Sequence, residues 1–157
     1  MLMLFTDGSV NTHSKNGYGA YLAVSDFGHS IDLLKTRVKV RRFEETSSTK
    51  LELQTLLWAL GNIEALGSKL IVYTDSQNIL SLQRRRGRFE QNDYRSKNNK
   101  QIKNHELYKE FFRMTDKLDC ELVKVSGHKV SSQKDDIDKF FTLVDRASRN
   151  ALRADEK

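Results

Sequence analysis

Apolar residues in this chain follow two spacings, and the first of them is typical of β-strands. Near the N-terminus, apolar stretches run continuously or alternate with polar residues, and turn-forming residues such as Asn16, Gly17, Asp26 and Gly28 separate them. The later run at residues 70–73 is continuously apolar, which is typical of a central strand buried on both faces. The predicted strands are residues 2–9, 18–25, 34–42, 70–73 and 122–125.

The second spacing is helical, with apolar residues three or four positions apart. After the N-cap candidates at 47–49, Leu53, Leu56 and Leu60 recur on one face, and Gly67 is expected to end this helix. The other predicted helices are residues 76–86, 104–117 and 136–153. Three early strands followed by alternating helices and strands predict an α/β domain, with helices on both faces of a mixed five-stranded sheet. No repeat or linker interrupts residues 1–157, so we expect a single domain.

Composition excludes several classes of protein. Of the 157 residues, 38% are hydrophobic and 31% are charged, a balance that excludes a disordered chain. The longest apolar stretches are a few residues long, which excludes a transmembrane helix. Residues 1–5 lack the basic region of a signal peptide, so we expect none. The single cysteine, Cys120, excludes an internal disulfide and a thiolate-rich zinc site. We therefore expect a cytoplasmic monomer without a membrane partner.

Positive charge is concentrated in one segment. The chain carries a net charge of +6 and has a pI near 9.4. Residues 81–104 contain eight Lys and Arg, among them Arg84, Arg85, Arg86 and Arg88, against Glu90 and Asp93, so this segment accounts for the whole surplus. Such a block favours a polyanionic partner, and the structural alternative is a solvated, charge-rich loop.

Four acidic residues stand where structure alone favours other residue types. Asp7 and Asp75 each follow an apolar strand and a threonine. If these two strands are parallel neighbours, both carboxylates point into one crevice at the carboxyl edge of the sheet. Glu52 and Asp145 lie on the apolar stripes of their helices. Each acid alone can be a turn residue, a cap or a partner of a helix dipole. Together they would repel one another, and a hard divalent cation such as Mg²⁺ would relieve that repulsion.

Five short motifs occur in a fixed order along nearly the whole chain. They are Phe5-Thr6-Asp7-Gly8-Ser9, Thr49-Lys50-Leu51-Glu52-Leu53, Tyr73-Thr74-Asp75-Ser76-Gln77, Gly127-His128 and Val144-Asp145. In this order they resemble the type 1 ribonuclease H family. The resemblance implies that the catalytic, metal-binding carboxylates are Asp7, Glu52, Asp75 and Asp145. It also implies that His128 assists proton transfer or product release.

The same resemblance implies a reaction. The expected enzyme is a metal-dependent endonuclease that hydrolyses the RNA strand of RNA–DNA hybrids and leaves 5′-phosphomonoesters. Two Mg²⁺ ions about 4 Å apart, with Mn²⁺ as a substitute, would activate a water and stabilise the leaving 3′ oxygen. This chemistry requires no Ser or Cys nucleophile.

Substrate contacts are expected around these motifs. The expected nucleic-acid-binding residues are Gly8, Ser9, Ser47, Ser48, Thr49, Gln77, Arg84, Arg85, Arg86 and Arg88. Gly8 would let the nucleic-acid backbone approach, and the arginines would reach phosphates from a helix end and the flexible connection after it. Ser48 and Thr49 stand where many members of the family have an Asn pair that reads RNA 2′-hydroxyls. Their hydroxyls can still donate and accept hydrogen bonds.

Two other classes of function stay open at this stage. Another nuclease with the same fold, such as a junction resolvase, also uses four acids, although the compact spacing and Gly127-His128 favour ribonuclease H. A proofreading exonuclease would need an acid where Ser9 stands. A non-catalytic nucleic-acid-binding module is supported only by the basic segment, and the four intact acids oppose it.

Overall fold

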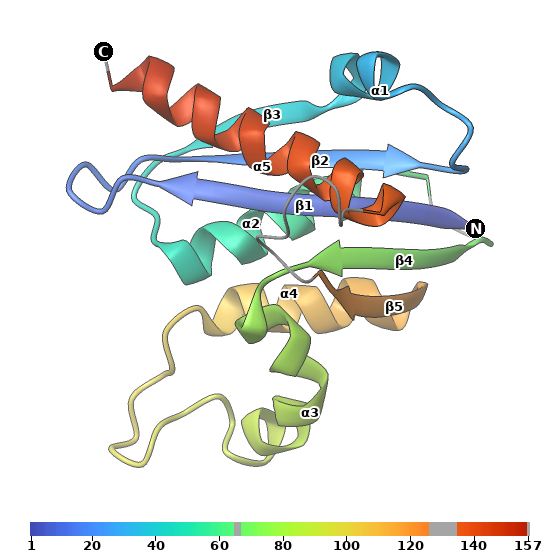
Figure 1. Ribbon diagram of the computed structural model, residues 1–157. Helices are drawn as coiled ribbons and strands as arrows, with labels where there is room; N and C mark the ends of the chain where they lie inside the picture. The colour runs from blue at the N-terminus through green and yellow to red at the C-terminus, as the bar shows by residue number, and fades with distance from the viewer. Residues whose placement is uncertain (65–66, 126–134, 157) are drawn as a thin grey trace.

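A five-stranded mixed sheet forms the centre of the computed structural model, which describes residues 1–64, 67–125 and 135–156 (Figure 1). The strands are β1 (Leu2–Val10), β2 (Gly17–Val24), β3 (Lys39–Phe43), β4 (Lys69–Thr74) and β5 (Asp119–Lys124). Their order across the sheet is β3-β2-β1-β4-β5. The pairs β1–β2 and β2–β3 are antiparallel, whereas β4 is parallel to both β1 and β5. The mixed five-stranded sheet predicted from the sequence is therefore confirmed.

Helices cover both faces of this sheet. They are α1 (Ile31–Arg37), α2 (Ser48–Asn62), α3 (Gln77–Gln91), α4 (His105–Asp116) and α5 (Asp136–Asp155). Helix α5 packs on β1 and β2 with α1 beside it, while α2 packs on the opposite face against α3 and α4 (Figure 1). Strand alternation sends Met3 and Phe5 into the α5 side of the core and Leu4 into the α2 side. No helix in the described part of the chain is long and apolar enough to span a membrane.

The prediction of one strand over residues 34–42 was wrong in its first half. Residues 31–37 form α1, and β3 begins only at Lys39. The Ser30 hydroxyl accepts a hydrogen bond from the Leu33 amide and caps this helix, and Leu34 is fully buried against α5. Helix formation here is decided by that cap and that anchor, which outweigh the alternating pattern of the sequence.

Two predicted helix ends were also wrong. Helix α2 stops at Asn62 instead of continuing to Gly67, and α3 continues to Gln91 beyond the predicted end at Arg86. The extra turn of α3 places Phe89 between Tyr94 and Tyr108, with ring centroids 5.7 and 5.2 Å apart. Stacking on residues of the following segment thus extends the helix through the arginine run.

Candidate active site

Two adjacent parallel strands, β1 and β4, position Asp7 and Asp75. Phe5 of β1 is in register with Tyr73 of β4, and their rings stack at 4.8 Å. Two residues further on, Asp7 lies near the end of β1, and Asp75 follows the last residue of β4. The two carboxylates interact electrostatically. The conditional expectation that parallel pairing would bring Asp7 and Asp75 to one edge of the sheet therefore agrees with the geometry.

Helix α5 brings Asp145 to the same place. Strand alternation directs Asp7 to the α5 side of the sheet, as it does Met3 and Phe5, and the Asp7 and Asp145 carboxyl groups are hydrogen-bonded. This turn of α5 is attached to β1 by the fully buried Ser148, whose hydroxyl lies 3.1 Å from the Ser9 hydroxyl. Ser148 also donates to the Asp145 carbonyl at 3.0 Å.

Glu52 reaches the site from the opposite layer, on the first turns of α2. It is half-buried and accepts a hydrogen bond of 2.5 Å from the Ser76 hydroxyl. Ser76 is also the N-cap of α3, where its hydroxyl oxygen accepts from the Ile79 amide. A residue next to Asp75 thus connects Glu52 to the loop that carries Asp75.

The electrostatics of these carboxylates reflect burial and mutual repulsion. Burial raises the pKa of Asp7 to about 8, with further contributions from the charge of Asp75 and the hydrogen bond to Asp145. Burial also raises the pKa of Glu52, and the charge of Asp75 adds to this effect, while the Ser76 hydrogen bond opposes it. The raised pKa values of Asp7 and Glu52 therefore show that the described side chains compensate the negative charge of this site only in part.

The chemistry of this donor set suits a hard divalent cation. All four groups are carboxylates, which offer the oxygen ligands that Mg²⁺ and Mn²⁺ prefer. A cation would offset both the burial of the Asp7 carboxylate and its repulsion by Asp75, which together raise the Asp7 pKa. Over residues 1–64, 67–125 and 135–156, no three His, Cys, Asp or Glu side chains already form a group that could hold a metal ion. The acids instead interact in pairs. His128, the fifth predicted catalytic residue, lies outside the described residues.

The space beside Gly8, where we expected nucleic acid to approach, is occupied by a side chain of α2. A Cβ at Gly8 would lie 2.9 Å from Leu51 Cδ2, and one at Gly17 would lie 2.8 Å from the same atom. A Cβ at Gly19, which pairs with Gly8 across β1 and β2, would overlap the Thr55 hydroxyl. Helix α2 therefore rests directly on glycines of the sheet, and this close approach positions Glu52.

The other expected contacts near Asp7 and Asp75 differ from each other. The Ser9 hydroxyl is engaged by Ser148 of α5, so its first partner is within the protein. Gln77 is exposed at the first position of α3, next to the site. Of these two side chains, Gln77 is the more accessible to a ligand.

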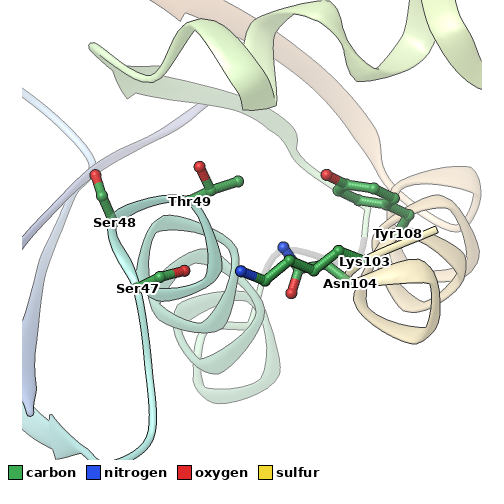
Figure 2. Close-up of a pocket in the computed structure, with 6 residues that line it drawn as sticks. All are labelled: Ser47, Ser48, Thr49, Lys103, Asn104 and Tyr108. Carbon is green, nitrogen blue, oxygen red and sulfur yellow. The ribbon is translucent and has the colours of Figure 1, made fainter. Parts of the chain in front are cut away.

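Ser47, Ser48 and Thr49 line a pocket between the starts of α2 and α4. Its volume is about 360 Å³, and its other lining residues are Lys103, Asn104 and Tyr108. Ser47 caps α2 by accepting a hydrogen bond from the Lys50 amide, and Lys103 extends across the gap towards it (Figure 2). The pocket thus combines hydroxyl groups, an ammonium group and the positive end of a helix dipole.

The four arginines of the basic segment do not share one environment. They lie within α3, so the expectation that they begin a flexible connection was wrong. Arg86 is held by Asp116 and Glu90, and Arg85 donates to Asn78 and lies over the Phe89 ring. Arg84 and Arg88 are exposed. Extension of the helix therefore divides the cluster into two packed and two exposed side chains.

The sequence analysis did not identify several residues of the site. Ser76 was expected only at a helix start, and its contact with Glu52 spans 24 positions, which no local pattern reveals. Lys103, Asn104 and Tyr108 join the pocket only because α4 packs beside α2. Arg149, which pairs with Asp145, could have been suspected from its spacing of four residues on one helix.

Comparisons with known proteins give the same fold and a family. The RNase H family model matches residues 1–145. No curated protein matches the chain. A solved structure of a foamy viral protease-reverse transcriptase in complex with dsDNA is similar, with a TM-score of 0.66 and 14% sequence identity over 94% of this chain and 93% of that chain. At this identity, the structural likeness concerns the fold alone.

Proposed function

Because the chain belongs to the RNase H family, we propose that it is a metal-dependent endonuclease that cleaves the RNA strand of RNA–DNA hybrids. The observation that carries the proposal is the convergence of carboxylates from β1, the end of β4, α2 and α5. Such an arrangement has no stabilising role without a counter-charge, since burial and repulsion raise the pKa of Asp7 to about 8. Membership of a family of nucleases that use divalent metals explains this cluster of carboxylates, since a bound metal ion would supply the counter-charge.

The roles of the residues follow from their positions. Two Mg²⁺ ions, or Mn²⁺ in their place, would supply an activated water and charge neutralisation at the scissile phosphate. Asp7, Glu52, Asp75 and Asp145 would hold the ions through their carboxylate oxygens. Ser76 would keep the Glu52 carboxylate oriented through its hydrogen bond.

Substrate binding is proposed at two surfaces of the chain. The pocket at the starts of α2 and α4 offers Ser48, Thr49 and Lys103 to a phosphodiester group, and the dipole of α2 favours an anion there. Exposed Arg84 and Arg88 on α3 would contact phosphates farther along the duplex. Both surfaces recognise a nucleic-acid backbone, which suits a monomeric enzyme acting on a duplex of any sequence.

A cleavage assay tests the proposal. The full chain is incubated with end-labelled RNA–DNA hybrid, duplex RNA, duplex DNA and a four-way DNA junction, each with Mg²⁺, Mn²⁺ or EDTA. We expect cleavage of the hybrid alone, within its RNA strand, with 5′-phosphate ends and only when metal is present. The variant Asp75→Asn serves as the inactive control for contaminating nuclease.

Other outcomes of this assay would replace the proposal. Cutting of the junction in preference to the hybrid would indicate a resolvase. Hybrid binding without cleavage in either metal would indicate a binding module. For His128, the expected result of His128→Ala is slower turnover by about 10²- to 10⁴-fold without loss of metal binding, since assistance with a proton is typically worth that much.

A further inference from the structure

An ion pair on α5 lies at the edge of the carboxylate site. Arg149 Nε is 3.0 Å from Asp145 Oδ1, and the two side chains are 50% and 26% exposed. They are four residues apart with the acid on the N-terminal side, the favourable order for such a pair on a helix. The pair gives Asp145 a positively charged partner that belongs to the protein itself.

The surroundings of Asp145 place this pair in competition with other charges. On one side, its carboxyl group is hydrogen-bonded to Asp7, so Asp145 lies between a like group and an opposite charge. The backbone of this turn is held by Ser148, which donates to the Asp145 carbonyl and contacts Ser9 of β1. The half-exposed Arg149 side chain can therefore leave Asp145 without any movement of the helix.

We propose that Arg149 is a built-in counterion of Asp145 that competes with the divalent cation and so weakens the affinity of the site for metal. The inference rests on the proposed function, since it takes Asp145 to be a metal ligand. A carboxylate paired with a guanidinium must give up part of that interaction before it serves a cation, and the loss is subtracted from the free energy of metal binding. Arg149 is thus a positioning residue that acts through Asp145.

An ordinary helix-stabilising ion pair makes a different prediction. A purely structural pair would change the melting temperature by the same amount with and without metal, and would leave the metal dissociation constant unchanged. A competing counterion stabilises only the metal-free state. The distinguishing measurement is therefore metal affinity, which needs no substrate and no turnover.

The experiment measures Mn²⁺ binding to the metal-free full chain at low ionic strength, by titration calorimetry and by the EPR signal of free Mn²⁺. The variants are Arg149→Gln, Arg149→Lys and Arg153→Gln, the last of which removes the same charge one turn farther along α5, where Arg153 is exposed. We expect Arg149→Gln to bind Mn²⁺ roughly fivefold more tightly, as for the loss of an interaction of about 1 kcal/mol. Arg149→Lys should stay near the wild-type affinity, and Arg153→Gln should match the wild type.

Thermal melts of the same proteins provide the second readout. Arg149→Gln should melt below the wild type in EDTA, because Asp145 then lacks its internal counter-charge. In saturating Mn²⁺ that deficit should disappear. An equal deficit in both conditions would overturn the proposal.

The remaining outcomes are also decisive. An unchanged or weaker Mn²⁺ affinity in Arg149→Gln would overturn the counterion role, as would equal tightening in Arg153→Gln, which would show a general effect of charge. If neither the wild type nor Arg149→Gln binds Mn²⁺, the proposed function fails together with the inference. If the wild type binds Mn²⁺ and Arg149→Gln binds it equally, only the inference fails.

Discussion

At the scale of single residues, Asp7 combines a predicted catalytic position with an unfavourable environment. Its carboxyl group is half-buried, faces the charge of Asp75 and is hydrogen-bonded to Asp145. These conditions raise its pKa from 3.8 to about 8, so the folded metal-free protein holds a proton that the unfolded chain has lost. The free energy of unfolding must therefore fall as the pH rises between these two values.

We expect Asp7→Asn to remove this pH dependence. The amide carries no charge at any pH in this range, so the variant should gain stability over the wild type as the pH rises from 5 to 8. The difference between the two proteins should widen by up to about 1.4 kcal/mol per pH unit over this range. Thermal melts in EDTA across this range measure it, and parallel stability curves for the two proteins would contradict the raised pKa. The same variant should lose cleavage activity, because it lacks a carboxylate ligand.

At the scale of elements, helix α2 positions Glu52 by resting on the glycines of β1 and β2. Gly8, Gly17 and Gly19 lie beneath Leu51 and Thr55, the neighbours of Glu52 in the first turns of the helix. A side chain at any of these three glycine positions would push this part of α2 away from the sheet. The distance between Glu52 and Ser76 therefore depends on the glycines beneath α2.

We expect Gly19→Ala to reduce both stability and activity. The new methyl group would overlap the Thr55 side chain, and overpacking of this kind costs about 1–3 kcal/mol. Melting temperature and kcat should both fall, and the added substitution Thr55→Ala should restore part of each by removing the overlap. Gly61→Ala is the matched control on α2, because nothing lies within 4 Å of its Cβ position. Its expected effect is a gain of about 0.5–1 kcal/mol from helix propensity.

Helix α3 presents arginines of two kinds, which should separate binding from stability. Exposed Arg84 and Arg88 are available to phosphates, whereas Arg86 is held by Asp116 and Glu90. In the double variant Arg84→Gln/Arg88→Gln, KM for the hybrid should rise severalfold and its salt dependence should become flatter, with kcat nearly unchanged.

Two controls accompany this measurement. Lys35→Gln/Arg37→Gln removes the same charge from exposed positions of α1, at the far end of the sheet from the site, and should leave KM and the salt slope unchanged (Figure 1). Arg86→Gln should lower the melting temperature instead, because it removes the contact between α3 and Asp116. Equal salt slopes for wild type and the α3 double variant would show that Arg84 and Arg88 touch no phosphate.

At the scale of the whole molecule, the carboxylate site joins three layers. Asp145 belongs to the α5 layer, Asp7 and Asp75 to the sheet, and Glu52 to the α2 layer. A cation held by these groups would cross-link both helical layers to the sheet. Metal binding should therefore be visible in the stability of the entire fold.

We expect Mg²⁺ and Mn²⁺ to raise the melting temperature in proportion to the logarithm of their concentration above the dissociation constant. The increase should be larger at pH 8 than at pH 6, because metal must displace the proton from Asp7. Differential scanning calorimetry with metal or with EDTA measures both effects. A shift that is equal at the two pH values would mean that Asp7 is not a ligand.

The sequence by itself determined the elements with strong periodicity and the chemical character of the site. The apolar runs of β1 and β4, the stripes of α2 and α5, and the acids Glu52 and Asp145 on those stripes are all local patterns. They were readable because burial selects apolar residues at a fixed period, and an acid that breaks the period needs another explanation. The mixed sheet and the family followed from the same residues.

Tertiary structure alone decided the contacts that no local pattern records. Leu34 is anchored in the core and helps turn half of a predicted strand into α1, and Phe89 stacks on Tyr108 and extends α3 through the arginines. Leu51 fills the space at Gly8, and Ser76 reaches Glu52 from another layer. The physical reason is common to these cases: packing and hydrogen bonding between distant segments outweigh local propensity by amounts that the local sequence does not encode.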